Sequence, residues 1–257
     1  MRKAIFITGG GSGIGRATAQ FFAAKGWFVG LADVNGAGIA ETAALLPEGA
    51  STQHVMDVRD RAAWESALAE FAVASGGRLD ILFNNAGIGA GGPMAVMTEG
   101  EIERTIDVNL KGVFWGAHAG LPYLRKTPGS ALVSTSSAAG IYAGAGMSAY
   151  AATKFGVRAM TESLDREWRD IGVKARTIMP SFIDTPLLDV TASGSNRAMR
   201  DVVRGAGMEF TPVVEAAQAV WDAAHGKRVH TLVGKTARRL HFATRWAPWR
   251  LPKAPKG

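Results

Sequence analysis

Three polar side chains have the types and the spacing needed to move a proton to or from an organic substrate. Tyr150 precedes Lys154 by four residues, so a helix would place both side chains on one face, one turn apart. Neither of the other tyrosines has a lysine four residues later. A phenol with a pKa near 10 is a poor base at neutral pH, and a neighbouring ammonium would lower that pKa. We expect Tyr150 to act as a general acid and base, with the hydroxyl of Ser137 as a further hydrogen-bonding group.

A cluster of glycines lies between the first predicted strand and a predicted helix. Thr8, Gly9, Gly13 and Gly15 form the pattern T-G-x-x-x-G-x-G. Glycines allow a sharp turn and the close approach of a pyrophosphate, whose charge is favoured at a helix N-terminus. A glycine run by itself also fits a flexible turn, but its place between strand and helix predicts a dinucleotide site.

Asp33 ends the second predicted strand, 20 residues after Gly13. A carboxylate there accepts hydrogen bonds from the adenosine ribose and repels a 2′-phosphate. Neither Ser12 nor Val34 supplies a compensating cation, and Arg16 is interpreted as an exposed helical residue. The pattern favours NAD over NADP, and a turn or N-cap role for Asp33 is the alternative.

These residues must be positioned by an α/β fold, because short β-rich segments alternate with longer segments of helical periodicity. Continuous apolar strands that alternate with helices predict a parallel sheet covered on both faces. We expect a doubly wound Rossmann fold with a seven-stranded, mostly parallel sheet. The expected strands are 4–8, 27–32, 52–56, 79–83, 131–135, 173–179 and 228–233, and the expected helices are 14–25, 37–46, 60–74, 99–126, 148–171 and 212–225.

Taken together, the motifs resemble those of the short-chain dehydrogenase/reductase family, in its compact single-domain branch. The resemblance covers roughly residues 3–186. It rests on the glycine pattern at 8–15, N-N-A-G at 84–87, the Asn of Val108-Asn109-Leu110, Ser137 thirteen residues before Tyr150, and Y-x-x-x-K.

The resemblance implies roles for further residues. Lys154 would also bind the nicotinamide ribose, and Asn109 would help hold a water that relays protons, unless it is a helix-interior hydrogen bonder. Ser181 stands where the family usually has Gly. The expected catalytic residues are Asn109, Ser137, Tyr150 and Lys154. The expected cofactor-binding residues are Gly9, Ser12, Gly13, Ile14, Gly15, Asp33, Asp57, Val58, Asn84, Ala86, Gly87, Tyr150, Lys154, Pro180, Ile183 and Thr185.

No metal site is expected, because the chain has no Cys and its five histidines show no ligand spacing. No apolar stretch reaches the roughly 20 residues of a membrane-spanning helix, and no signal peptide is recognised, so we expect a cytoplasmic protein. The resemblance implies a homodimer or homotetramer that packs through the two long helices. These helices contain Trp115 and Trp168, for which core packing is equally consistent.

The charge is unevenly distributed along the chain of 257 residues. The net charge is +7, but residues 227–257 hold nine Lys/Arg and no Asp or Glu, so residues 1–226 carry 20 minus 22, or −2. Terminal basic residues do not indicate a nucleic-acid binder, which spreads them over a face of its fold. We divide the chain into a domain at 1–234, with a substrate lid at about 185–211, and a basic C-terminal extension at 235–257.

The extension at 235–251 carries Phe242, Trp246 and Trp249 at helical spacing, and Pro248 and Pro252 limit the expected helix to a few turns. Packing on the protein's own body or on a neighbouring subunit is one interpretation. An amphipathic helix that contacts anionic lipid is the alternative.

The segments expected to bind substrate are mostly apolar, which suits a hydrophobic alcohol or ketone. We therefore expect an NAD-dependent oxidoreductase that interconverts a secondary alcohol and its ketone by hydride transfer. The alternative is a non-catalytic dinucleotide-binding or regulatory protein; a nucleotide-sugar epimerase would need a longer substrate domain. The apolar residues in question are Met94, Ile141, Met147, Phe182, Ile183, Leu187 and Leu188.

Overall fold

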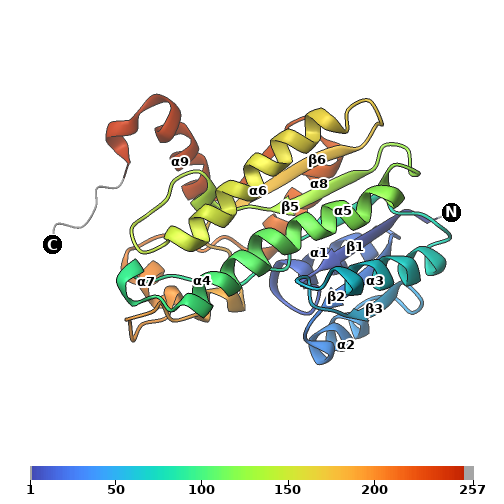
Figure 1. Ribbon diagram of the computed structural model, residues 1–257, viewed down its shortest axis with the longest axis horizontal. Helices are drawn as coiled ribbons and strands as arrows, with labels where there is room; N and C mark the ends of the chain where they lie inside the picture. Colours follow the sequence, from blue (N-terminus) through green and yellow to red (C-terminus); the bar gives the residue numbers. More distant parts are fainter. Residues whose placement is uncertain (1, 252–257) are drawn as a thin grey trace.

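The computed structural model describes residues 2–251. At its centre lies a sheet of seven strands, all parallel, in the order β3-β2-β1-β4-β5-β6-β7 (Figure 1). This confirms the expected doubly wound fold, including the seventh strand. The strands are β1 (Ala4–Thr8), β2 (Phe28–Asp33), β3 (Ser51–Val55), β4 (Ile81–Asn84), β5 (Ala131–Thr135), β6 (Lys174–Pro180) and β7 (His230–Val233).

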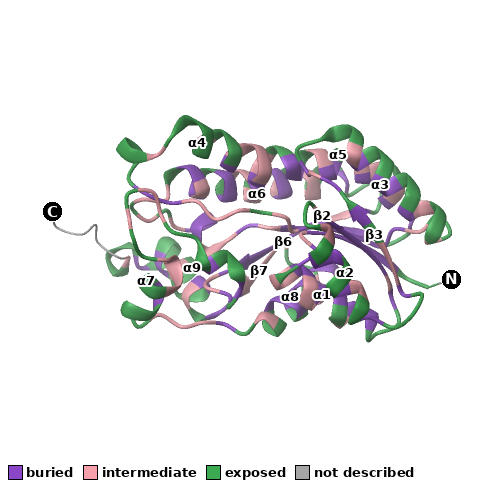
Figure 2. Ribbon diagram, turned by 90° about the horizontal axis from the view of Figure 1, so that it is seen from below, coloured by how far each residue is buried: buried purple, intermediate pink, exposed green. Residues whose placement is uncertain are grey.

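Helices cover both faces of the sheet (Figure 2). One face is covered by α1 (Gly13–Ala23), α2 (Gly36–Ala44) and α8 (Val213–His225). The other is covered by α3 (Arg61–Ala74), α4 (Glu99–Ile106), α5 (Gly112–Leu124) and α6 (Ser148–Glu167).

Alternation along the strands divides the core into two layers. In β1, Ile5 and Ile7 pack with Phe22 on the α1 and α8 side, whereas Phe6 packs with Trp64 on the opposite side. Successive strand residues point to opposite faces, so an uninterrupted apolar strand stabilises both layers at once. Trp115 and Trp168 both pack in the second layer, so these two residues belong to the core.

The long helix expected at 99–126 is interrupted. A π-helical segment at Asp107–Lys111 separates α4 from α5, and Asn109 lies at its centre. Single π turns inside α-helices occur frequently at functional sites. Asn109 therefore lies in the irregular turn that joins α4 to α5.

The C-terminal helix is limited to a few turns, as the prolines predict. α9 runs over Lys235–Trp246 and is followed by a 3-10 turn, η5, over Pro248–Arg250. Pro248 lacks the N–H that a continuing helix would need, which explains the break.

The strand order predicts where a ligand would bind. β1 lies between β2 and β4, so the connections leave it in opposite directions at this point of the sheet. In open α/β sheets ligands bind beyond the carboxyl ends of the strands at such a switch point. The segments beyond these strand ends include η3 (Ala138–Gly140), η4 (Pro186–Asp189) and α7 (Met199–Gly205).

Candidate active site

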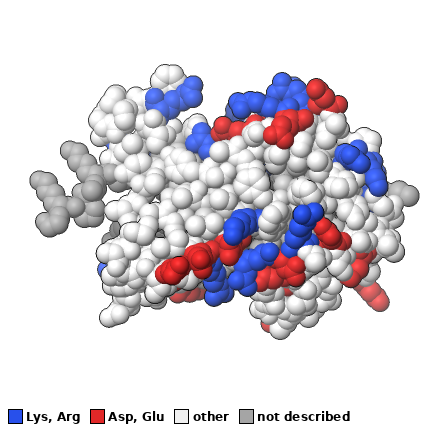
Figure 3. Space-filling view, in the orientation of Figure 1, with Lys and Arg blue, Asp and Glu red and all other residues white. Residues whose placement is uncertain are grey.

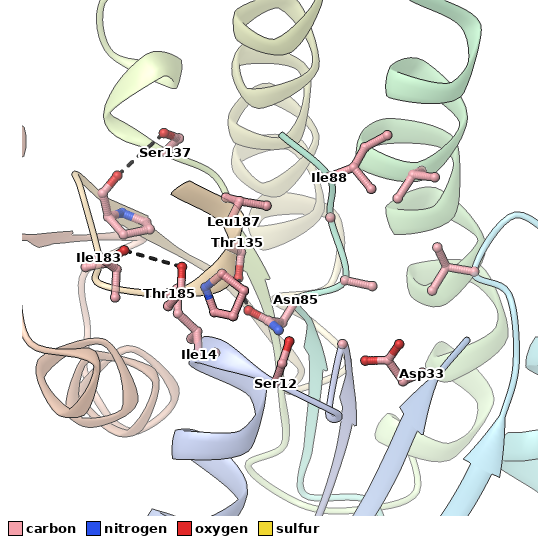
Figure 4. Close-up of a pocket in the computed structure, with 18 of the residues that line it drawn as sticks. Ser12, Ile14, Asp33, Asn85, Ile88, Thr135, Ser137, Ile183, Thr185 and Leu187 are labelled. Carbon is pink, nitrogen blue, oxygen red and sulfur yellow. Dashed lines mark hydrogen bonds between the residues drawn. The ribbon is translucent and has the colours of Figure 1, made fainter. Parts of the chain in front are cut away.

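A cavity of about 290 Å³ lies beyond the carboxyl ends of the strands, at the switch point between β1 and β4. Figure 4 shows Asp33 and Ser137 at opposite ends of it, with Ser12, Asn85 and Thr135 between them. The cavity is long and crosses the edge of the sheet, which is the shape that a dinucleotide site needs.

The glycine loop forms the floor of this cavity because its backbone is tightly folded. Gly9 and Gly13 have φ angles of +68° and +50°, which L residues rarely adopt. A Cβ on Gly15 would lie 2.0 Å from the carbonyl oxygen of Gly9. Only glycine therefore allows α1 to begin so close to β1.

The first turn of α1 has free donors. Ser12 occupies the N-cap position but its side chain makes no capping hydrogen bond. The first N–H groups of a helix have no partner within the helix, and the helix dipole favours a negative charge beside them. A phosphate group fits these donors.

Asn85 joins the ends of three strands beside the glycine loop. Its side-chain amide donates to the Thr8 carbonyl oxygen at 3.0 Å, and its Oδ1 accepts from the Thr135 hydroxyl at 3.3 Å. The Thr8 hydroxyl in turn accepts from the backbone N–H of Asn85 and of Ala86, at 3.0 and 3.1 Å. Asn85 thus fixes β1, β4 and β5 relative to one another at the cavity wall.

Asn84, which we expected at the cofactor site, faces away from the cavity. Its side chain is buried and donates to the Val113 carbonyl oxygen of α5 at 2.9 Å. Asn84 and Asn85 are neighbours on an extended segment, so their side chains point to opposite sides, and Asn85 is the one that lines the cavity.

Asp33 lines the other end of the cavity and is held by backbone donors. Its Oδ2 accepts from the N–H of Gly11 at 3.0 Å and its Oδ1 from the N–H of Asn35 at 3.0 Å. The N-cap residue of α2 is Asn35, so the N-cap alternative for Asp33 is wrong. A carboxylate has further lone pairs beyond these two bonds, which leaves acceptors for a ligand hydroxyl.

Arg16 is half-buried rather than exposed, which corrects our expectation. Its guanidinium donates to the Thr42 hydroxyl at 3.0 Å and pairs with Glu41 at 2.7 Å. This cation ties α1 to α2 and is already paired with a carboxylate.

Asp57 forms an ion pair with Arg59, which is not among the predicted site residues. Arg59 donates to its carboxylate from Nε and from its terminal nitrogen, the shortest contact being 2.6 Å. This hydrogen bonding lowers the pKa of Asp57, so the carboxylate stays ionised.

Tyr150, Lys154 and Ser137 meet at the end of the cavity opposite Asp33. The Lys154 ammonium lies 5.5 Å from the centre of the Tyr150 ring, and the Tyr150 and Ser137 hydroxyls are hydrogen-bonded. Lys154 is buried and donates to the Thr135 carbonyl oxygen at 3.0 Å. Ser136 serves the framework, because its buried hydroxyl donates to the Lys154 carbonyl oxygen at 2.8 Å.

Burial acts on both titrating groups. It raises the pKa of Tyr150, against the smaller lowering effect of the hydrogen bond with Ser137, and it lowers the pKa of Lys154 to about 8. In the protein alone, burial therefore outweighs any lowering by the Lys154 ammonium, and the lowered phenol pKa expected beside an oxidised nicotinamide stays a prediction. At neutral pH the phenol holds its proton, so in this state Tyr150 is a proton donor.

Asn109 is fully buried and does not line the cavity. Its Oδ1 accepts from the Ile88 N–H at 2.8 Å and its Nδ2 donates to the Ile88 carbonyl oxygen at 2.9 Å. A Cβ on Gly87 would lie 3.1 Å from that Oδ1 and 3.7 Å from the Lys154 Nζ. The amide therefore holds the segment after β4 beside Lys154, and the role of Asn109 in a proton relay stays a prediction.

Most of the expected cofactor-binding residues line this cavity. The exceptions are Gly15 and Asn84, which lie behind the wall. Several other lining residues were not predicted to bind the cofactor, most of them next to an expected one in the chain. These are Val34, Met56, Asn85, Ile88, Val108, Thr135, Ser136, Ser181, Pro186, Leu187 and Leu188.

A second cavity, of about 320 Å³, shares Ser137 and Tyr150 with the first. Its wall is mostly apolar and, of the residues we expected there, includes Met147, Phe182, Leu187 and Leu188. The other three expected residues lie elsewhere. Met94 is exposed, Ile141 is buried against Met179 and Ala237, and Ile183 lines only the first cavity.

Two segments complete the second cavity. Arg200 of α7 holds η4 in place, because it donates to the Asp189 carboxylate at 2.6 Å and to the Thr185 carbonyl oxygen at 3.0 Å, and it also pairs with Asp184. Thr236 and Leu240 of α9 form part of the wall. The C-terminal extension thus contributes to the region where a substrate would lie.

Residues 2–251 contain no group of three or more His, Cys, Asp and Glu side chains arranged to hold a metal ion. Over the same described residues, no helix is both long enough and apolar enough to cross a bilayer.

Comparison with known proteins places the chain among redox enzymes. The family model described as short chain dehydrogenase matches residues 3–196. Levodione reductase from Leifsonia aquatica is 38% identical over 192 residues, which are 73% of this chain and 72% of that protein. Cyclohexanol dehydrogenase from Acinetobacter sp. (strain SE19) is 36% identical over 194 residues, 72% of this chain and 75% of that protein.

A solved structure agrees over the whole length. The crystal structure of a short chain dehydrogenase/reductase from Burkholderia phymatum in complex with NAD matches with a TM-score of 0.83 and 27% identity, covering 100% of this chain and 98% of that one.

Proposed function

The chain belongs to the short-chain dehydrogenase/reductase family, and from this premise we propose that it interconverts a hydrophobic secondary alcohol and its ketone with NAD. One observation carries the proposal. The long cavity at the glycine loop and the apolar cavity beyond it meet at Tyr150 and Ser137. A dinucleotide in the first and an alcohol in the second would have their reacting ends at the same two hydroxyls.

The donors and acceptors of the first cavity fit NAD. The N-terminus of α1 would hold the pyrophosphate, Asp33 the adenosine ribose, and Lys154 the nicotinamide ribose. Asp57 and Val58 would border the adenine, and Pro180, Ile183 and Thr185 the nicotinamide. When bound, the nicotinamide ring supplies or accepts the hydride. The complex of the Burkholderia phymatum relative with NAD supports this choice of cofactor.

Tyr150 is proposed to move the proton. In ketone reduction its phenol, kept protonated by burial, donates to the oxygen of the former carbonyl. In alcohol oxidation Tyr150 must first release this proton to solvent; its phenolate oxygen then accepts the proton of the alcohol, and the positive charge of Lys154, 5.5 Å from the ring centre, favours the phenolate. Ser137, hydrogen-bonded to Tyr150, would hold the substrate oxygen within reach.

The absorbance of reduced nicotinamide tests this function. Purified protein is mixed with NAD and either cyclohexanol, a linear secondary alcohol or lactate, and kcat/KM is compared. We expect cyclohexanol to be oxidised faster than lactate. The second cavity is lined by apolar residues such as Leu187 and Leu188, and its described wall contains no cation that could pair with a carboxylate. Turnover that is fastest with lactate contradicts the substrate class. Calorimetric binding of NAD without turnover of any alcohol or ketone would instead indicate a non-catalytic binding protein.

The cofactor preference should shift toward NADP when the charge at the ribose end is changed. In the double variant Asp33→Asn with Val34→Arg, the amide oxygen still accepts from Gly11 while the repulsion of a 2′-phosphate is replaced by an attraction. We expect the ratio of kcat/KM for NAD to that for NADP to fall by at least about tenfold, which corresponds to about 1.4 kcal/mol. The matched control is Asp170→Asn, an exposed carboxylate outside the cavity. Equal use of both cofactors by the unaltered protein contradicts the role of Asp33.

The domain division, the location and the assembly remain proposals. We propose one domain at 1–234 with a lid at about 185–211, followed by the extension at 235–257, in a cytoplasmic homodimer or homotetramer. Phe114 of α5 and Phe155 of α6 support the assembly, because they are 47% and 39% exposed on the two long helices. Apolar side chains left exposed on neighbouring helices suit a subunit interface.

A further inference from the structure

The outer face of α9 combines exposed aromatic rings with exposed cations. Phe242 and Trp246 are 54% and 65% exposed, and Trp249 in η5 is 74% exposed. Packing of these rings on the body of the same chain is therefore wrong, and packing on a neighbouring subunit stays a prediction. Four exposed cations accompany the rings on the same helix: Lys235, Arg238, Arg239 and Arg245.

The inner face of α9 is held by the body, so the helix is fixed and not a loose tail. Ala237 is fully buried against Ile141 and Met179, and Leu240 packs on the same cluster. Ala243 is also buried. These positions lie three residues apart, which is one side of a helix, and the rings and cations lie on the opposite side. In Figure 1 the helix stands out from the rest of the molecule.

The charge of this region is of one sign. Residues 227–257 contain nine Lys/Arg and no Asp or Glu, although residues 1–226 carry a slight excess of acid. In the view of Figure 3 the lobe formed by α9 shows Lys and Arg atoms but none of Asp or Glu. One cation at the start of the helix, Lys235, lies 3.7 Å from Glu209. The other exposed cations of α9, Arg238, Arg239 and Arg245, have no acidic residue on the helix itself to pair with, so they can face an anionic partner.

We propose that α9 and η5 bind the surface of an anionic lipid bilayer. An interfacial helix lies in the membrane plane with aromatic rings in the headgroup region and Lys or Arg beside the phosphates. Tryptophan is suited to this place because its ring is apolar and its N–H is polar. Both kinds of group occur together on the one face of α9 that the body leaves uncovered.

The same helix forms part of the wall of the apolar cavity. Thr236 and Leu240 line that cavity, on the side of α9 opposite the exposed rings. Docking would therefore bring the wall of the substrate cavity within one helix diameter of the membrane, about 10 Å. On the proposed function, this arrangement suits an alcohol or ketone that is dissolved in the bilayer.

Co-sedimentation with vesicles tests the docking without reference to catalysis. The full-length protein is mixed with phosphatidylcholine vesicles or with vesicles that also contain phosphatidylglycerol, at low and at high salt. We expect binding to the anionic vesicles alone, weakened by salt because the charges are exposed. The double variant Arg239→Ser with Arg245→Ser should bind the anionic vesicles at least about tenfold more weakly. The double variant Trp246→Ser with Trp249→Ser should also lose binding.

The matched control removes two cations elsewhere. Arg166→Ser with Arg169→Ser changes the net charge by the same amount at exposed positions at the end of α6, and it should bind as the unaltered protein does. Circular dichroism checks that all the variants are folded. Three results would overturn the proposal. They are no binding to anionic vesicles, an equal loss of binding in the control, or a change of the oligomeric state of the α9 variants in solution without a change in vesicle binding. The last result would assign the face to a second copy of the chain.

Discussion

Replacing Tyr150 by phenylalanine should lower kcat for alcohol oxidation and for ketone reduction by about a hundredfold to ten-thousandfold, the contribution typical of a positioned general acid or base. The substitution removes the hydroxyl that is hydrogen-bonded to Ser137, while the ring beside Lys154 remains. Because the dinucleotide would be held mainly by the glycine loop and Asp33, we expect its dissociation constant to change only a few-fold. Steady-state absorbance gives kcat in both directions, and calorimetry gives the dissociation constant.

The control for this variant is Tyr123→Phe. It removes a phenol hydroxyl from a residue of α5 that packs against the core and lines neither cavity. It should keep the kcat of the unaltered protein. If Tyr150→Phe also keeps that kcat, proton transfer does not pass through Tyr150. If it loses dinucleotide affinity in proportion to kcat, the role of Tyr150 is in binding.

Replacing Gly15 by alanine should weaken dinucleotide binding. The new Cβ would lie 2.0 Å from the Gly9 carbonyl oxygen, so the glycine loop and the start of α1 must move apart. Overpacking of this kind destabilises proteins by about 1–3 kcal/mol. The displaced donors should raise the dissociation constant for NAD by more than about tenfold, which calorimetry measures, and thermal unfolding measures the loss of stability.

Gly100→Ala provides the comparison for this second variant. Gly100 is an exposed glycine in α4 whose Cβ would meet no atom within 4 Å. Alanine there should leave NAD affinity unchanged and stabilise the fold by about 1 kcal/mol, since glycine is the weaker helix former. Unchanged NAD affinity in Gly15→Ala would mean that the loop is not the phosphate site.

The sequence was sufficient for the fold and for the two ends of the site. Strand and helix periodicity predicts the sheet, and the carboxyl ends of parallel strands lie at one edge, so Asp33, Ser137 and Tyr150 were expected near one another. The four-residue spacing of Tyr150 and Lys154 was likewise sufficient, because α-helical geometry brings such residues to one face.

Other features depend on tertiary contacts that no local pattern encodes. Nothing in the Asn84-Asn85 pair says which amide faces the helices and which the cavity; the packing of α5 against β4 decides it. The pairing of Arg16 with Glu41 joins two helices, and the lowering of the Lys154 pKa follows from burial. The π-helical segment at Asn109 was missed because the residues around it keep a helical apolar pattern.

The central claim is that one phenol exchanges a proton with a substrate beside a bound dinucleotide. A crystal structure with NADH and an unreactive analogue of a hydrophobic ketone tests it most directly. We expect the adenosine ribose at Asp33, the nicotinamide end beside Lys154, and the analogue's oxygen within about 2.6–3.2 Å of the Tyr150 hydroxyl. An analogue oxygen held by other groups, or a dinucleotide bound outside the cavity between Asp33 and Ser137, would contradict it.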